Sequence, residues 1–413
     1  MSPSKKEVIR LYADHVSPGK VDVYAQYGML LVPGRREGCF IYDRDGTRYL
    51  NCHCNGGVFN LGHRNPRVIR ALTRALTEYD IGNHHLVSEP KAMLARMLAR
   101  TLPAGLNQVV FGVGGGEAID LAIKLARGVT GRPGVISAFG GYHGHTGLAL
   151  ATGDAKFREK FGPMPPGFFQ VPFGDIGALE SAVSDQTAAV IMETIPATLG
   201  IVVPGRDYFR KVKALCARAG ALLVMDEVQT GFGRTGTFWC FEQFRVVPDI
   251  VVTGKGMSGG IYPMSATIYH ERHRDFFRKD PFVHISTFGG SEAGCFAAME
   301  AIRISSGKKF LSTVRASGDR IRAGLGALAK EFPGAGFRVR GLGLMLGLEF
   351  ADEMRSLFML KLLFDRGVYM VYSGNDRRVL QLLPPLIITR REIAVLVRAV
   401  RDSLVELVRG TGG

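Results

Sequence analysis

The chain has 413 residues, a length typical of two to three domains at roughly 150 residues each. Hydrophobic residues make up 46% and charged residues 22%. This composition excludes a disordered chain, because enough apolar surface is present to offset the entropy of ordering. The 53 glycines follow no Gly-X-Y period, which excludes collagen and indicates tight turns or sites lined by backbone.

The net charge of +15 could attract nucleic acid, a membrane surface or a phosphorylated ligand. Basic residues are scattered along the chain, so we interpret them as a solubilising surface and expect no nucleic-acid partner. No apolar stretch is long enough to cross a membrane, and the first residues lack the apolar core of a signal peptide. The six cysteines are too sparse for a disulfide framework. We therefore expect a cytoplasmic protein without membrane association.

The first recognisable element is a hairpin over residues 38–50, with its turn at Asp45-Gly46. Further on, apolar runs alternate with helical patterns over residues 117–127 and 206–219. The expected strands are 108–111, 135–139, 188–192, 221–225, 250–252 and 264–268. Continuous apolar strands separated by helices are typical of an α/β fold with a mostly parallel sheet covered on both faces. Such sheets place their sites at the carboxyl ends of the strands.

The pattern changes at about residue 296, where long helical stretches begin. Strands are expected among them at 337–340, 345–350, 368–372 and 379–383, an α+β arrangement. We predict a smaller α+β domain built from both termini around a large α/β domain. In this division residues 1–50 join the small domain, 51–295 form the large domain and 296–413 complete the small one.

Two charged residues directly follow buried strands. Asp226 ends the strand at 221–225 and opens a glycine-rich loop; a carboxylate there is costly unless a cationic or hydrogen-bonding group meets it. Lys255 follows the strand at 250–252 between Gly254 and Gly256. Partial burial would lower the pKa of this lysine and suit it to Schiff-base chemistry. The alternatives are a capping aspartate and a lysine that extends to the surface.

Two glycine-rich segments favour a phosphorylated ligand with an aromatic ring. Gly114-Gly115-Gly116 ends a strand and opens a helix, where backbone N–H groups and the helix dipole bind anions. Tyr142 follows another strand and offers a ring for stacking. Neither a phosphate P-loop nor a dinucleotide fingerprint is present. Together, an anion nest, a stacking ring, an aspartate and a lysine are the groups that a single phosphorylated aromatic cofactor would contact.

Histidines and cysteines do not indicate a metal centre. Cys52-His53-Cys54 lacks the Cys-x-x-Cys spacing, and the adjacent His84 and His85 would point apart on a regular element. We therefore expect no metal. His143 follows Tyr142 and could either line the site or pack in the interior.

In combination these motifs resemble the class III (subgroup II) pyridoxal-phosphate-dependent aminotransferases of fold type I, over nearly the whole chain. The segments that carry the resemblance are 42–46, 61–63, 114–116, 142–144, 226–236, 254–256, 286–290 and 384–389. The resemblance implies a large domain with a mostly parallel sheet, a smaller α+β domain and pyridoxal 5′-phosphate as cofactor. It also implies a homodimer, or a dimer of dimers, with shared active sites.

The resemblance also implies roles for individual residues around the cofactor ring. Lys255 would hold the cofactor as a Schiff base and then act as general base and acid. Asp226 would pair with the pyridine nitrogen and keep it protonated, so that the ring accepts electrons. Gln229 would hydrogen-bond the phenolic oxygen, and Val228 would pack beneath the ring opposite Tyr142.

The resemblance also implies which residues bind the phosphate of the cofactor. Gly115 and Gly116 would hold it, and Thr287 would reach it from the partner subunit. The family usually has serine or threonine where this chain has Gly116, so one hydroxyl is lost while the backbone donors remain.

Two substrate positions also depart from the family. Members that use glutamate place an arginine where this chain has Gln381, and a gating glutamate where it has Thr198. The arginine and the glutamate form one charge pair in those members. Their joint absence here is consistent, because either residue alone would be a buried charge without a partner, which is costly. We therefore expect glutamate and 2-oxoglutarate to be poor partners, unless Arg340 or Arg378 replaces the missing arginine. His143 is a further candidate substrate contact.

The sequence predicts an aminotransferase that moves an amino group between a primary amine or amino acid and a keto or aldehyde acceptor. An aminomutase or amino-acid racemase of the same fold is the first alternative, followed by a decarboxylating transaminase. A nicotinamide-dependent dehydrogenase fits less well because the dinucleotide fingerprint fails. A nucleic-acid-binding protein is suggested only by the charge of +15.

Overall fold

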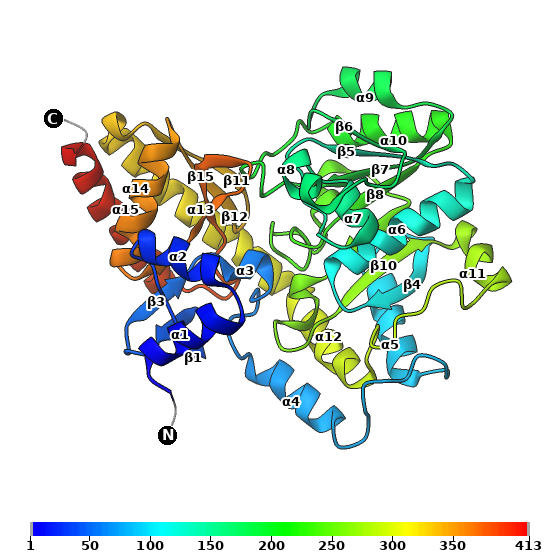
Figure 1. The fold of residues 1–413 in the computed structure, drawn as a ribbon, viewed down its shortest axis with the longest axis horizontal. Helices are drawn as coiled ribbons and strands as arrows, with labels where there is room; N and C mark the ends of the chain where they lie inside the picture. Colours follow the sequence, from blue (N-terminus) through cyan, green and yellow to red (C-terminus); the bar gives the residue numbers. More distant parts are fainter. Residues whose placement is uncertain (1–2, 411–413) are drawn as a thin grey trace.

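The computed structural model describes residues 3–410. A seven-stranded sheet in the order β4-β10-β9-β8-β7-β5-β6 forms the centre of its larger part (Figure 1). The strands are β4 (Leu106–Gly112), β5 (Gly134–Ala138), β6 (Phe168–Val171), β7 (Thr187–Glu193), β8 (Leu222–Asp226), β9 (Ile250–Thr253) and β10 (Ser265–His270). Strands β9, β8, β7, β5 and β6 pair in parallel, whereas β10 is antiparallel to both β4 and β9. The predicted mostly parallel sheet is confirmed.

Alternate residues of the central strands pack on opposite faces of this sheet, as the pleat requires. In β8, Leu222 and Val224 belong to the core shared with helix α6 (Gly115–Thr130), while Leu223 and Met225 belong to the core on the other face. Burial on both faces explains why these strands are continuously apolar.

Helices cover both faces of the sheet. Besides α6, the larger part contains α4 (Pro66–Ala75), α5 (Glu89–Ala99), α7 (Gly147–Ala151), α8 (Ala155–Arg158), α9 (Ile176–Ala182), α10 (Tyr208–Ala219), α11 (Asp275–Lys279) and α12 (Glu292–Ser305). The cores on the two faces leave the carboxyl ends of the strands free, and the loops there carry the candidate site.

The smaller part contains two four-stranded sheets, β1-β2-β3-β13 and β11-β12-β15-β14. Their strands are β1 (Pro33–Glu37), β2 (Phe40–Asp43), β3 (Arg48–Asn51), β11 (Phe337–Leu342), β12 (Met345–Phe350), β13 (Val368–Tyr369), β14 (Val371–Ser373) and β15 (Asp376–Leu382). The expected single strand at 368–372 is divided, since β13 pairs with β3 and β14 pairs with β15. One hydrophobic core joins Met29–Cys52 to residues 314–407.

The helices of the smaller part are α13 (Lys308–Glu331), α14 (Glu353–Asp365) and α15 (Arg390–Gly410). The predicted boundary at residue 295 falls inside α12, whose Ala298 and Ile302 pack in the core of the larger part. The division into domains stays a prediction.

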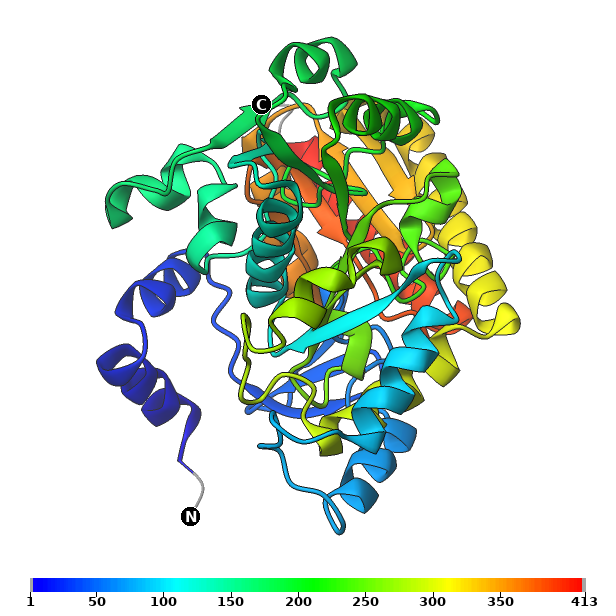
Figure 2. The same cartoon turned by 90° about the vertical axis from the view of Figure 1, so that its right-hand side faces the viewer.

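Helices α1 (Lys5–His15) and α2 (Pro18–Gln26) lie on the outside of the molecule, and neither contains a buried residue (Figure 2). Within residues 3–410, no helix has the length and apolar character needed to span a membrane. The same residues contain no group of three or more histidine, cysteine, aspartate or glutamate side chains arranged to hold a metal ion.

Candidate active site

A cavity of about 320 Å³ lies at the carboxyl ends of the parallel strands. Its lining comes from the loops after β4, β5, β8 and β9 and from the end of β7. The lining residues are Gly115, Gly116, Tyr142, His143, Gly144, His145, Thr146, Glu193, Asp226, Val228, Gln229 and Lys255. The fold thus brings together the residues that the sequence predicted around a cofactor ring, with Thr287, Thr198 and Gln381 outside this lining.

Asp226 is the last residue of β8 and is 4% exposed. Its Oδ2 lies 2.7 Å from His143 Nδ1, and its Oδ1 accepts the Val228 N–H at 3.0 Å. Burial alone would lower the pKa of His143, but the hydrogen bond and negative charge of Asp226 raise it. The pair therefore holds a buried carboxylate in a fixed orientation at the cavity wall.

Lys255 has a backbone φ of +39°, a left-handed value that residues other than glycine rarely adopt. Its Nζ donates to Gln229 Oε1 at 2.9 Å, and a Cβ built on Gly56 would lie 3.1 Å from the same nitrogen. Burial lowers the pKa of Lys255, opposed by the negative charges of Glu193 and Asp226. A half-buried amine with a lowered pKa is suited to nucleophilic attack on an aldehyde.

The predicted phosphate nest lies at the start of α6. Gly114 is the N-cap and offers no side chain, so the first N–H groups of the helix have no side-chain cap. A Cβ on Gly115 would lie 3.1 Å from Val228 Cγ1, which shows how closely the helix start approaches the cavity floor. Free N–H groups and the helix dipole at this position favour a bound anion.

Tyr142 lies at the mouth of the cavity and is 38% exposed. Its ring centroid is 5.1 Å from that of His145. Its backbone N–H donates to Glu193 Oε1 at 2.8 Å, so the end of β7 fixes the loop that carries the ring. Tyr142 and Val228 both line the cavity, and an aromatic ring with an apolar side chain suits a flat heteroaromatic ligand.

Glu193 was not predicted as a cavity residue from the sequence. It lies opposite Asp226 in the parallel pairing of β7 and β8. Burial, with the nearby charge of Asp226, raises the pKa of Glu193 to about 7, opposed by His143 and by the Tyr142 N–H. The signal for it was a carboxylate at the end of an apolar strand, the same signal that identified Asp226.

The neighbouring Glu227 has a different environment. Its two oxygens accept four hydrogen bonds at 2.5–2.9 Å, from the hydroxyls of Thr194 and Thr230 and from the N–H groups of Cys240 and Phe241. All of its close partners are internal, so Glu227 fastens the glycine-rich loop after β8 rather than facing a ligand.

Thr198 and Gln381 each hydrogen-bond to backbone of another segment. Gln381 Nε2 donates to the Ala197 carbonyl at 3.3 Å, and Thr198 Oγ1 donates to the Gly140 carbonyl at 2.9 Å. Both side chains therefore attach segments next to the cavity to other backbone, and their role as substrate contacts stays a prediction.

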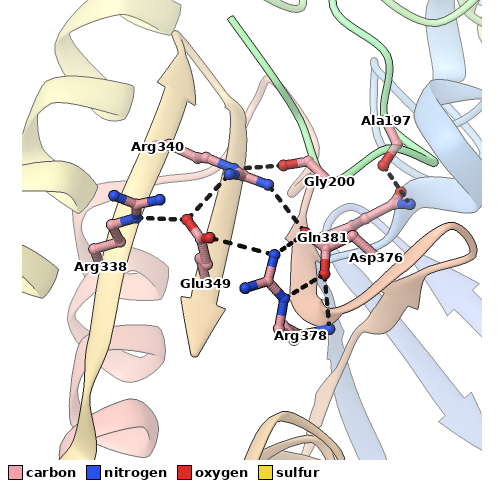
Figure 3. A network of polar contacts seen from close by, with 8 residues as sticks. All are labelled: Ala197, Gly200, Arg338, Arg340, Glu349, Asp376, Arg378 and Gln381. Atoms are coloured by element: carbon pink, nitrogen blue, oxygen red, sulfur yellow. Dashed lines mark hydrogen bonds and ion pairs between the residues drawn. The ribbon is translucent and has the colours of Figure 1, made fainter. Parts of the chain in front are cut away.

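The two arginines that could replace the missing charge already have carboxylate partners. Arg338, Arg340, Glu349, Asp376 and Arg378 form one cluster, here called the Glu349 network (Figure 3). Arg340 Nη1 lies 3.0 Å from Glu349 and its Nε donates to the Gly200 carbonyl, while Arg378 Nε lies 2.9 Å from Asp376. Neither lines the cavity, so the network supplies no free cation to it.

Thr287 is exposed and belongs to the segment between α11 and α12. Phe282, Ile285 and Phe288 of this segment are also exposed, with Phe282 58% accessible. The ring of Phe282 contacts His85 at a centroid distance of 5.7 Å, which places the segment beside the exposed Leu86. The assignment of Thr287 to the phosphate site stays a prediction.

Comparison with known proteins places the chain in a family. The sequence matches the family described as aminotransferase class-III over residues 23–404, and the chain belongs to that family. It is 49% identical to an uncharacterized aminotransferase of Archaeoglobus fulgidus, covering 98% of this chain and 97% of the relative. It is 33% identical to a putrescine aminotransferase of Pectobacterium atrosepticum, covering 98% of this chain and 90% of the relative.

Solved structures of similar fold carry the same class of activity. The ornithine aminotransferase of Toxoplasma gondii superposes with a TM-score of 0.90 at 26% identity, covering 99% of this chain and 97% of the other. A second structure of that enzyme, at 26% identity with a TM-score of 0.86 and covering 99% of both chains, has pyridoxal phosphate at partial occupancy in its active site. An (S)-enantioselective omega-transaminase of Thermomicrobium roseum has a TM-score of 0.88 at 28% identity, covering 98% of this chain and 99% of the other.

The chain is therefore a pyridoxal-phosphate-dependent aminotransferase, as the sequence predicted. The family, the fold class, the enzyme class and the cofactor are confirmed. The cavity fits this cofactor, because it combines a half-buried lysine, a buried aspartate and an uncapped helix start in one lining.

Proposed function

We propose that this enzyme transfers the amino group of an amine or amino acid with a neutral, largely apolar body, rather than that of glutamate. Lys255 is the amine that binds the cofactor and then moves the proton on the reacting carbon. The observation that carries the assignment is the placement of the half-buried Lys255 in one cavity with the buried Asp226. The neutral amide of Gln229 as hydrogen-bond partner leaves the lysine free of a tight ion pair.

Pyridoxal phosphate, when bound, supplies an aldehyde for the amino group and a ring that withdraws electrons from the reacting carbon. Asp226 would hold a proton at the ring nitrogen by its negative charge. His143 orients that carboxylate through the 2.7 Å contact with Oδ2 and is a positioning residue. Gln229 would hydrogen-bond the phenolic oxygen, and Val228 and Tyr142 would pack against the ring.

The phosphate is assigned to the backbone N–H groups of Gly115 and Gly116 at the start of α6, with Thr287 of a second subunit. The exposed apolar side chains around Thr287 support this, because contiguous apolar surface of this kind marks interaction sites. We therefore propose a homodimer. The cysteines among the described residues are all free and buried, which suits a reducing compartment such as the cytoplasm.

A second cavity supports the substrate class. It has a volume of about 310 Å³, and its lining includes Tyr24, Ile41, His53, Asn55, Phe59 and Tyr369. Asn55 precedes Gly56, the residue that faces Lys255 Nζ, so the cavity borders the reacting lysine. Burial lowers the pKa of His53 to about 4, aided by the charges of Lys255 and Arg234, which keeps its ring neutral at pH 7.

Charge decides which ligands suit this second cavity. Arg36 brings a positive charge to the lining, and no aspartate or glutamate occurs among the described residues there, so the distal ammonium of a diamine would find no counter-ion. One relative is a putrescine aminotransferase and one structural neighbour an ornithine aminotransferase, and this cavity favours a different donor. A neutral body with aromatic or aliphatic character would bury apolar surface against Tyr24, Phe59 and Tyr369.

Half-reaction kinetics test this assignment, with conversion of the cofactor to its aminated form as the readout. We expect an arylalkylamine or alanine to exceed glutamate and putrescine in efficiency. In Gln381→Arg, glutamate should gain about ten- to a hundred-fold, the value of a charge-assisted hydrogen bond to a carboxylate. Gln186→Arg, at an exposed position, is the matched control. A wild-type enzyme that uses glutamate as well as its best other donor contradicts the proposed substrate class.

A further inference from the structure

Gly116 and Thr146 share one small space at the start of α6. A Cβ built on Gly116 would lie 2.6 Å from Thr146 Oγ1 and 3.2 Å from its Cγ2. These separations are too short for a side chain at residue 116 while Thr146 holds its present rotamer. The hydroxyl of Thr146 therefore occupies the place where a side chain of residue 116 would begin.

The loop carrying Thr146 approaches the helix through a glycine. Gly144 has a φ of +121°, and a Cβ on it would lie 2.7 Å from Gly116 Cα. Only a residue without a side chain allows this close approach. The approach aligns Thr146 with Gly115 and Gly116 in the lining of the cofactor cavity.

The Thr146 hydroxyl is not used by the secondary structure next to it. Thr146 is the N-cap of α7, where a threonine side chain usually accepts a backbone N–H, yet it makes no such hydrogen bond. Asp120 of α6 accepts the Ala149 N–H at 2.6 Å instead. Within residues 3–410 no hydrogen bond of the Thr146 hydroxyl is present, so its proton is available to a ligand.

We propose that Thr146 Oγ1 donates a hydrogen bond to the cofactor phosphate and replaces the side-chain hydroxyl that Gly116 lacks. This inference rests on the proposed placement of the phosphate at the start of α6. A hydroxyl directed at a phosphate oxygen forms a charge-assisted hydrogen bond, which is stronger than a neutral one. The anion site then combines backbone donors from α6 with a side chain from the loop after β5.

The first test compares Thr146→Val, which keeps the shape without the hydroxyl, with Thr146→Ser, which keeps the hydroxyl. Dissociation constants are measured for pyridoxal phosphate and for pyridoxal, which lacks the phosphate. We expect Thr146→Val to weaken pyridoxal phosphate about ten- to a hundred-fold and to leave pyridoxal unchanged. Thr146→Ser should bind both ligands within about threefold of wild type, which corresponds to less than a single net hydrogen bond.

Equal affinity of wild type and Thr146→Val for pyridoxal phosphate would overturn the proposal, as would equal weakening of both ligands, which indicates a structural effect. Failure of the wild type to bind pyridoxal phosphate would overturn the proposed cofactor site as a whole. The two failures are therefore distinguishable.

A double-mutant cycle tests the shared space itself. Gly116→Ala should displace the Thr146 hydroxyl and weaken pyridoxal phosphate binding. In the Thr146→Ala background the same change should have little effect, because the remaining Cβ of residue 146 would be 3.4 Å away. Non-additive effects support the proposal. Additive effects of the two substitutions on the dissociation constant would overturn it.

Discussion

The cofactor cavity and the Glu349 network arrange their charges in opposite ways. In the network every arginine lies within 4.0 Å of a carboxylate, and the cluster is closed on itself (Figure 3). In the cavity the half-buried Lys255 donates to a neutral amide, and Glu193 is buried with its pKa raised to about 7. Charges that satisfy one another fasten the smaller part to the Gly200 segment. Buried charges left beside a cavity are available to a ligand.

The largest effect on turnover is expected from a substitution at Lys255. Lys255→Ala removes the amine that we propose binds the cofactor and moves the proton, so turnover should fall by about 10²–10⁴-fold or more. Lys279→Ala, at an exposed position of α11, should leave turnover unchanged. Initial rates with the best donor measure both variants. If Lys255→Ala turns over within tenfold of the wild-type rate, the cavity would be no more important for catalysis than the Glu349 network, and the assignment of Lys255 would be contradicted.

Asp226 and Glu227 provide the next contrast, because Asp226 lines the cavity while the adjacent Glu227 is bonded to interior groups. Asp226→Asn should lower kcat by on the order of 10²–10³-fold, as expected when one preorganised charge is lost. Glu227→Gln should instead reduce the free energy of unfolding by about 1–3 kcal/mol, since it disturbs four internal hydrogen bonds. Kinetics and urea unfolding separate the two effects; the reverse assignment would contradict the account.

Stability should depend on pH in opposite ways in the two regions. Burial raises the pKa of Glu193 from 4.5 to about 7, so between these values the folded chain retains a proton that the unfolded chain has lost. The unfolding free energy should therefore fall with rising pH over this window, by about 3 kcal/mol from this group. Urea unfolding of the cofactor-free protein should show a flatter profile in Glu193→Gln. An unchanged profile would argue against a buried carboxyl at this position.

The smallest effect on turnover is expected in the Glu349 network. The hydrogen bond from Arg338 lowers the pKa of Glu349, opposed by burial and aided by the charge of Arg340. Its stabilisation should be present above pH 4.5 and be lost as the pH falls below that value. Glu349→Gln should cost about 1–3 kcal/mol of unfolding free energy at pH 7 while kcat stays near wild type. A large loss of kcat with unchanged stability would place the network in the catalytic machinery.

Local patterns in the sequence predicted the features that depend on single elements. Buried strands, the hairpin over residues 38–50, and the positions of Asp226 and Lys255 at strand ends all follow from apolar runs bounded by charge or glycine. The antiparallel placement of β10 and the division of residues 368–372 between two sheets were not predicted, because strand partners are set by tertiary packing.

Site residues that depend on contacts between distant segments were also missed. The pairing of His143 with Asp226 and the proximity of Glu193 arise only when β5, β7 and β8 lie side by side. The space shared by Gly116 and Thr146 depends on the approach of two loops. No periodicity along the chain reports such an approach.

The central claim is that the cavity at the carboxyl ends of the strands holds the cofactor on Lys255. Reduction of the holoenzyme with borohydride makes the bond between cofactor and lysine permanent, and peptide mass spectrometry then locates it. The account predicts one modified peptide per chain, with the cofactor mass on Lys255 and none on the exposed Lys279. A modification confined to another lysine, or an unmodified Lys255 in fully loaded enzyme, would contradict it.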